Sequence, residues 1–207
     1  KLKSLHLEAV GATDLSPFAN AELNTLILKN VNYTTLKPFA HQPIKELELY
    51  GAKSIDPNEF INFKLQKLTI NYSNITDLSF LNVQDLKHLT INGGRLSELN
   101  FLKNAPLEYL HLYQMPVKNI SPLQNKKITF LSLAECRIED LSPLLTLKNL
   151  ETLVISPNQL QPNWENTIVK LKPTLKQIGV YNRQTNYKTV DAFIAEHKGF
   201  NINNPKK

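Results

Sequence analysis

The sequence predicts a curved right-handed α/β solenoid, with a parallel β-sheet on its concave face, short 3₁₀ or helical turns on its convex face and a helical C-terminal cap. Two observations predict this fold. An apolar pattern, L-x-x-L-x-L, returns every 21 residues through seven consecutive units. A short motif of the kind Asp14-Leu15-Ser16-Pro17-Phe18 recurs after this pattern. A fixed period of this length is typical of a chain that stacks copies of one structural unit.

The apolar pattern defines nine rungs. It begins at Leu2, Leu23, Ile44, Leu65, Leu86, Leu107 and Ile128, then at Leu150 after one extra residue, and again at Leu175. Alternate residues such as Leu131 and Leu133 point to one face of a short strand. A single coil cannot bury that face, whereas stacked coils can, and their strands then pair in parallel. The predicted domains are a nine-rung solenoid, residues 1–181, and a capping helix with its tail, residues 182–207.

The return phrase predicts one turn of 3₁₀ helix on the outside of each coil. In Leu141-Ser142-Pro143-Leu144 the leucines point inward, and Pro143 suits the first helical position because it has no N–H to satisfy. We expect the Ser142 side chain to accept a backbone N–H as an N-cap. We expect the recurring aspartates to bond nearby backbone N–H groups. These aspartates are Asp14, Asp56, Asp77 and Asp140.

On these residues the chain resembles the leucine-rich repeat family over roughly residues 1–180. Its short units with an S-P-L return are most similar to internalin-type repeats and to the leucine-rich tails of some bacterial Ser/Thr protein kinases. The run LKQIGVYNRQTNYKTVDAFIAEH is similar to the terminal segment of those tails. The resemblance implies a non-catalytic module that recognises a protein or peptide. The alternative that it implies is a regulatory or sensor domain of a larger bacterial Ser/Thr kinase, with the catalytic domain outside this chain.

One column departs from the pattern of the family, which usually places a ladder of asparagines there. Here the column holds Val10, Val31, Ala52, Ser73, Gly94, Met115, Cys136 and Asn158. We therefore expect the side-chain ladder to be absent, or to be replaced by packing of small residues or by water. Cys136, the only cysteine, is expected to be a small buried filler rather than a reactive thiol.

The last units lengthen into helices that are expected to cap the solenoid. The first helix is predicted from the i, i+4, i+7 spacing of Trp164, Ile168 and Leu171. The second places Val190, Phe193, Ile194 and His197 on one face. Thr189 is expected to cap the start of this second helix and Gly199 to close its end.

Composition and charge argue against several classes of protein. Of the 207 residues, 42% are hydrophobic and 20% are charged, as in ordinary globular proteins, and no apolar run is long enough to cross a membrane. The net charge is +6, but residues 161–207, with eight Lys or Arg against three Asp or Glu, carry +5 of it. A nucleic-acid surface usually shows a basic stripe along the body. We therefore expect a monomer that neither binds nucleic acid nor inserts into a membrane.

The sequence contains none of the common catalytic motifs. The sequence holds no phosphate-binding loop, no H-E-x-x-H and no G-x-S-x-G. His88 and His111 occupy neighbouring rungs, but two imidazoles alone do not make a metal site. We therefore expect no enzyme activity, no cofactor and no metal. With no targeting segment to indicate a compartment, a cytoplasmic or a cell-surface location both stay open.

The concave sheet is the expected binding surface, because stacked strands project solvent-facing side chains there in columns. Neighbouring strands lie about 4.8 Å apart. Units five to seven therefore gather an aromatic patch of His88, Tyr109, His111, Tyr113 and Phe130, and Tyr50 adds a separate contact. Clustered exposed aromatic side chains are typical of a protein-binding hot spot. The alternative is that they stabilise one another across neighbouring strands.

Overall fold

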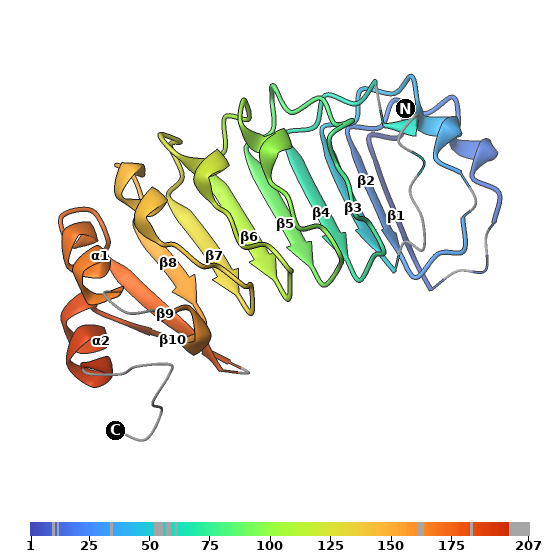
Figure 1. Ribbon diagram of the computed structural model, residues 1–207. Coiled ribbons are helices and arrows are strands. Elements are labelled where there is room, and N and C mark those ends of the chain that lie inside the picture. The colour runs from blue at the N-terminus through green and yellow to red at the C-terminus, as the bar shows by residue number, and fades with distance from the viewer. Residues whose placement is uncertain are drawn as a thin grey trace.

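The strands form one continuous sheet that curves along a single arc (Figure 1). The computed structural model describes residues 1–9, 11, 13–33, 35–51, 56, 59–60, 62–160, 164–182 and 184–198. The strands are β1 Ser4–Glu8, β2 Thr25–Lys29, β3 Glu46–Tyr50, β4 Lys67–Asn71, β5 His88–Asn92, β6 Tyr109–Tyr113, β7 Phe130–Ala134, β8 Thr152–Ile155, β9 Gln177–Asn182 and β10 Gln184–Lys188. From β1 to β9 each strand pairs in parallel with the next, which confirms the predicted solenoid. The predicted domain boundary at residue 181 stays a prediction.

The strands pair in register, so equal positions of the repeat form straight columns across the sheet. Leu26, Leu47 and Leu68 follow one another in an inward column, and all three are fully buried. The opposite face carries alternate positions, such as Tyr109 between His88 and Phe130. The core is therefore one apolar strip that runs the length of the solenoid, because each rung buries the leucines of its neighbours.

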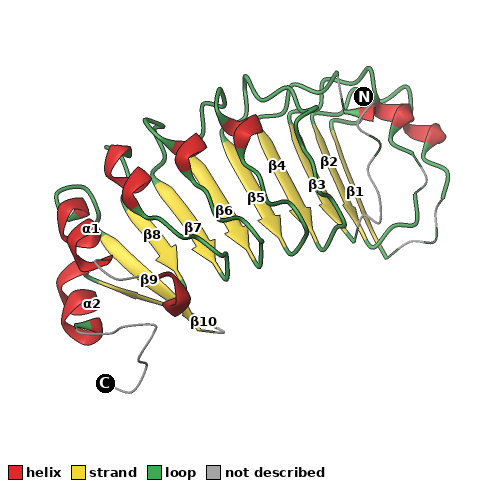
Figure 2. Cartoon of the chain, in the orientation of Figure 1, coloured by secondary structure: helices red, strands yellow, loops and turns green. Residues whose placement is uncertain are grey.

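Short 3₁₀ turns form the return side of the coils, as predicted (Figure 2). They are Ser16–Phe18, Lys37–Phe39, Asn100–Leu102, Ser121–Leu123, Ser142–Thr146 and Pro157–Gln159. The expected N-cap role of Ser142 is wrong, because Leu141 holds the cap position and no side chain caps the turn. The Asp140 carboxylate instead accepts the Ser142 N–H at 2.8 Å and the Ser142 hydroxyl at 2.6 Å. Asp14 and Asp77 bind their serines in the same way, which confirms the expected role for these three aspartates.

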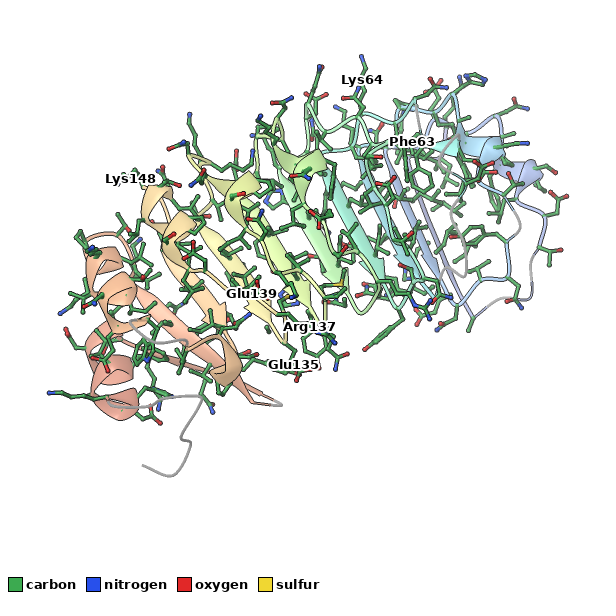
Figure 3. The ribbon with its side chains drawn as sticks, in the orientation of Figure 1. Phe63, Lys64, Glu135, Arg137, Glu139 and Lys148 are labelled. Atoms are coloured by element: carbon green, nitrogen blue, oxygen red, sulfur yellow. The ribbon has the colours of Figure 1, made fainter. Side chains whose placement is uncertain are left out.

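Most strands end at a residue with left-handed backbone. The angle φ is positive at Ala9, Asn30, Gly51, Tyr72, Gly93, Gln114 and Glu135, which recur every 21 residues. Figure 3 labels Glu135 on the edge of the solenoid where the strands end, opposite Lys148. This backbone turns each N–H toward the next rung, so that Tyr72 donates to the Asn92 carbonyl at 2.7 Å and Gly93 to the Tyr113 carbonyl at 2.8 Å.

A buried glutamine of the eighth rung bonds the backbone of the seventh rung. Gln159 is fully buried, and its amide donates to the Leu133 carbonyl at 2.7 Å and to the Cys136 carbonyl at 3.3 Å. Its Oε1 accepts the Ser156 N–H at 2.8 Å. The Ser156 hydroxyl in turn accepts the Glu135 N–H at 2.7 Å, where the rungs before it use a backbone carbonyl. Side-chain-to-backbone bonding is therefore present at this rung through a glutamine.

The column in which the family usually has asparagines is mostly filled here by other buried side chains. Val31, Ser73, Met115 and Cys136 are buried in it, whereas Val10 and Ala52 lie outside the described residues. Cys136 is fully buried, and this burial raises the pKa of its thiol to about 12. The cysteine is therefore the inert filler that the sequence predicts.

The C-terminal helices form as predicted and cover the end of the core. They are α1, Trp164–Leu171, and α2, Val190–His197. The predicted face of α1 is buried, and its Trp164 ring meets Phe193 of α2 edge to face at 5.3 Å. The Thr189 hydroxyl accepts the Ala192 N–H at 3.3 Å and so caps α2. Gly199 lies outside the described residues. Among the residues described, no helix is long and apolar enough to span a membrane.

The strand β10 turns back antiparallel on β9, which the sequence analysis did not predict. Gly179 makes room for it, because a Cβ there would lie 2.6 Å from the Thr185 side chain and 3.3 Å from the Tyr187 ring. Thr185 and Tyr187 therefore lie across β9, facing the same hollow as Phe130 of β7.

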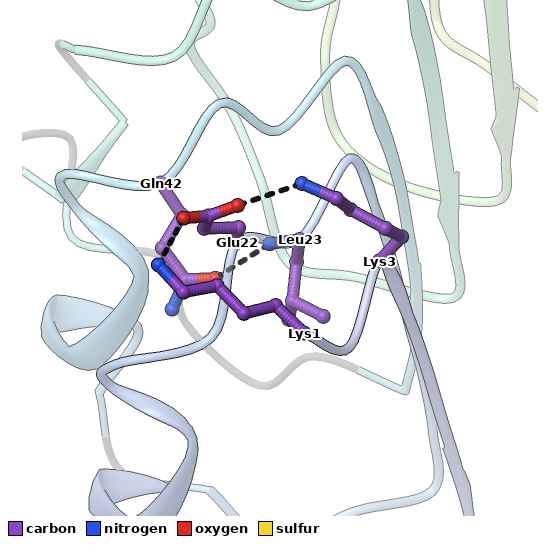
Figure 4. Close-up of polar contacts among 5 residues, drawn as sticks. All are labelled: Lys1, Lys3, Glu22, Leu23 and Gln42. Carbon is purple, nitrogen blue, oxygen red and sulfur yellow. Dashed lines mark hydrogen bonds and ion pairs between the residues drawn. The ribbon is translucent and has the colours of Figure 1, made fainter.

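Polar side chains join the first two coils to their neighbours (Figure 4). The Glu22 carboxylate accepts from Lys3 at 2.8 Å and also pairs with Lys1. Gln42 is buried, and its Oε1 accepts the Leu23 N–H at 3.0 Å while its amide donates to the Phe18 carbonyl at 2.9 Å. The Gln42 bonds satisfy backbone groups next to the short turns.

Candidate functional site

An aromatic row occupies the third position of three consecutive rungs on the concave face. His88, Tyr109 and Phe130 lie in register on β5, β6 and β7. The Tyr109 and Phe130 rings stack at 4.5 Å with their planes 6° apart, and the His88 ring lies 6.0 Å from Tyr109. All three side chains keep some exposure. The row therefore packs across neighbouring strands and also presents aromatic surface to solvent, and its role in binding stays a prediction.

Tyr113 is the seventh residue of its repeat, and its hydroxyl is hydrogen-bonded to that of Tyr181 on β9. The two hydroxyl oxygens are 3.1 Å apart, and the rings meet edge to face at 5.0 Å. This hydrogen bond, followed by desolvation, raises the pKa of Tyr113 to about 12, so the phenol is protonated at neutral pH. The contact brings the last rung against the middle of the concave face.

His111 is the fifth residue of its repeat and lies between Thr90 and Ser132 of the neighbouring strands. Its side chain is half-buried, and burial lowers the pKa of the imidazole. His111 is therefore neutral at pH 7, with one ring nitrogen as a donor and the other as an acceptor. Its chemistry suits a hydrogen bond more than an ion pair.

His111, Tyr113 and Phe130 line a hollow of about 270 Å³. The wall opposite these strands comes from Tyr181, Thr185 and Tyr187 of the C-terminal hairpin. Tyr72, the left-handed residue after β4, also faces it. Among the described residues that line it, none carries a charged side chain at neutral pH. We call this space the aromatic hollow.

Six residues that line the aromatic hollow come from outside β6 and β7 and were not predicted as contacts from the sequence: Tyr72, Asn92, Val154, Tyr181, Thr185 and Tyr187. A signal existed for Tyr181, which holds the seventh position of the ninth rung, in line with Tyr113 in the repeat. Thr185 and Tyr187 reach the site only because β10 folds back over Gly179. Tyr72 follows the last position of β4, where the backbone turns left-handed.

A second hollow of about 620 Å³ adjoins the first and shares Tyr72 and Asn92 with it. It extends toward Tyr50, the separate contact that the sequence predicts, and its lining includes Lys67. The Lys67 ammonium lies 2.7 Å from the Glu48 carboxylate, and this hydrogen bond raises the pKa of the lysine. The two hollows together form a trough across β3 to β9, polar and charged toward β3 and aromatic toward β9.

The described residues contain no group of three or more His, Cys, Asp or Glu side chains that could hold a metal ion. His88 and His111 lie on neighbouring strands but open onto different hollows. The arrangement on the concave face is therefore one of aromatic rings, hydroxyls and amides.

Comparison with solved structures places this chain among leucine-rich repeat folds. It is similar to internalin C2 of Listeria monocytogenes, with a TM-score of 0.63 and 27% identity, covering 74% of this chain and 71% of that chain. It is also similar to a second internalin of Listeria monocytogenes, inlF, with a TM-score of 0.65 and 23% identity, covering 87% of this chain and 56% of that one. No family model and no curated protein matches the chain.

The fold is a leucine-rich repeat solenoid of the kind seen in these internalins. At a coarse level, the likeness to internalin C2 supports a protein-interaction module.

Proposed function

We propose that this chain is a non-catalytic recognition module that binds an extended segment of a protein or peptide across its concave sheet. The observation that supports the proposal is the trough formed by the two adjoining hollows. Its lining joins partly exposed aromatic rings to hydroxyl and amide groups. Such side chains supply large contact area at a low cost in side-chain entropy, and they are enriched in binding hot spots.

The proposed contact residues are the aromatic patch His88, Tyr109, His111, Tyr113 and Phe130, with Tyr50 toward the far end of the trough. All six lie on strands whose backbone is held on both sides by the sheet. Preformed sites of this kind lose little freedom on binding. The distance from β3 to β7 is four strand spacings, or about 19 Å, which an extended segment of about six residues spans.

The experiment that tests the proposal is removal of the patch centre. We expect the triple variant Tyr109→Ala, His111→Ala and Tyr113→Ala to bind a purified natural partner at least about 30-fold more weakly, because hot-spot truncations cost about 2 kcal/mol or more. Binding is measured by calorimetry with a partner identified by cross-linking. The matched control is Ser4→Ala, His6→Ala and Glu8→Ala, which changes the same three repeat positions on β1, away from Tyr50.

Two results would contradict the proposal. One is undiminished binding by a triple variant that melts like the unaltered chain. The other is an equal loss in the control, which would show that the site is not confined to the aromatic half of the sheet. Circular dichroism melting of both variants separates lost binding from lost folding.

The kinase-associated alternative stays a prediction that rests on sequence resemblance alone. A kinase domain encoded in the same reading frame would support it. The monomeric state and the absence of nucleic-acid binding also stay predictions, and light scattering and a salt-dependent gel-shift assay check them.

A further inference from the structure

Two buried polar atoms in the aromatic hollow have no hydrogen-bond partner. Ser132 is 1% exposed, and its Oγ is unpaired, as is the buried Oδ1 of Asn92. The Asn92 amide nitrogen donates to the Asn71 side-chain oxygen, which leaves Oδ1 as the free end of that side chain. Buried polar groups in native proteins are normally satisfied. Because an amide oxygen can only accept, the group that Asn92 lacks is a donor.

The walls of the hollow favour a positive charge. Five aromatic rings line it, from Tyr72, Tyr113, Phe130, Tyr181 and Tyr187. The faces of aromatic rings are negative in potential and attract cations. Among the described lining residues there is no lysine or arginine, and burial lowers the pKa of His111, which favours its neutral form at pH 7. A cation entering here therefore meets aromatic side chains and acceptor atoms without a competing positive group among these residues.

The size of the hollow suits one side chain of a segment that lies along the trough. Its volume of about 270 Å³ lies below the roughly 300 Å³ at which small-molecule pockets begin. The guanidinium of arginine is planar, carries five N–H donors, stacks on aromatic rings and is weakly hydrated, whereas the ammonium of lysine is compact and strongly hydrated. Arginine therefore matches both the rings and the unpaired acceptors better than lysine does.

We propose that the aromatic hollow takes an arginine side chain of the partner segment, with the guanidinium between the rings and its N–H groups directed at Asn92 Oδ1 and Ser132 Oγ. The inference rests on the proposed function and names the anchor residue of its partner. Because both acceptor atoms are buried, entry requires a wall ring to turn aside. Tyr72, 71% exposed, and Tyr187, 48% exposed, are the two most exposed of the five rings.

The first test uses a tripeptide probe on the intact chain. Acetyl-Gly-Arg-Gly-amide is titrated against the chain while the tyrosine ring signals are followed by NMR. The matched probe replaces arginine by citrulline, which keeps the length and shape but is uncharged. We expect the arginine peptide to bind at least about fivefold more tightly, as a cation over several aromatic faces should. Equal binding of the two peptides, or no binding of either, overturns the proposal.

The second test changes the charge of the wall at Thr185, which is partly exposed on β10. Relative to the size-matched Thr185→Gln, we expect Thr185→Glu to tighten the arginine peptide and Thr185→Lys to weaken it, each at least about threefold. Neither change should alter binding of the citrulline peptide by as much. An arginine affinity that is the same in the Glu and Lys variants overturns the proposal.

The outcome also separates this inference from the function on which it rests. If the arginine probe fails while the triple variant at Tyr109, His111 and Tyr113 loses its protein partner, the recognition function stands and the arginine anchor is wrong. If the triple variant keeps its partner, the recognition function itself is wrong, whatever the peptide titrations give.

Discussion

Single residues decide how the strands leave the sheet. Seven positions in the repeat adopt left-handed backbone, but only Gly51 and Gly93 among them are glycines. A side chain costs about 1–2 kcal/mol in this conformation. The chain tolerates the cost at Gln114 and Glu135 because the turned N–H gains a partner on the next rung. Where a glycine is present, that cost is avoided.

The adjacent glycines Gly93 and Gly94 provide a residue-scale test. We expect Gly93→Ala to lower the free energy of unfolding by about 1–2 kcal/mol, because φ is +66° and the new Cβ would lie 3.3 Å from the Tyr72 ring. The matched control is Gly94→Ala, whose Cβ would meet its neighbours only at ordinary contact distances, the nearest at 3.4 Å. Urea unfolding measures both. Equal destabilisation by the two variants would contradict the explanation from backbone conformation.

At the scale of elements, the return turns at Ser16, Ser79 and Ser142 are held by the aspartate two residues earlier and not by an N-cap serine. Asp14 and Asp77 have a carboxyl pKa below the ordinary 3.8 because the serine two residues on donates first its backbone N–H and then its hydroxyl. The pKa of Asp140 is lowered chiefly by the Ser142 hydroxyl and then by its N–H. The folded-state pKa lies below the unfolded value. The three carboxylates therefore stabilise the fold above the unfolded pKa, and this contribution is lost as pH falls below it.

The turns therefore predict part of the acid sensitivity of the chain. We expect the triple variant Asp14→Asn, Asp77→Asn and Asp140→Asn to lose less stability than the unaltered chain between about pH 5 and pH 2, because the amides still accept the N–H but do not titrate. Urea unfolding across this pH range measures the difference. Asp85→Asn, at an exposed position before β5, serves as a control for a single lost charge. Parallel stability profiles for the triple variant and the unaltered chain would contradict the prediction.

At the scale of the whole molecule, each rung is supported by its neighbours and by little else. Interior rungs such as β5 have a strand on both sides, whereas β1 pairs on one side only within the described residues. Leu5 of β1 is 7% exposed, against full burial of Leu89 on β5. At the other end, α1 and α2 cover the core. Stability in such a stack is close to a sum of rung and interface contributions.

This asymmetry predicts a gradient of backbone protection along the solenoid. In hydrogen exchange of the 207-residue chain, we expect β1 and β2 amides to exchange at least about tenfold faster than those of β5 to β8, because terminal rungs open at lower free energy. The β9 amides, held between β8 and β10, serve as the internal comparison at the capped end. Uniform protection from β1 to β8 would show a single cooperative unit and contradict the prediction.

Much of the fold follows from the sequence because its period is strict. The spacing of 21 fixes the register, so Tyr109 is bound to lie between His88 and Phe130 once the strands stack. The strand β10 could not be predicted from the period, because Gln184–Lys188 does not contain the repeat pattern. Its residues instead alternate Thr185 and Tyr187 with polar side chains. For the same reason, the residues predicted from the sequence include three that line the aromatic hollow, His111, Tyr113 and Phe130, but none from the wall that β10 supplies.

The reversed direction of β10 also limits how this array can lengthen. A further coil at this edge would meet β10 antiparallel, so it would not continue the stack of equal parallel rungs. Coils gained or lost between β1 and β4 would leave the aromatic hollow in place, whereas a coil inserted between β6 and β9 would separate Tyr113 from Tyr181. Homologues of different length would thus keep the aromatic end only where the change lies near β1.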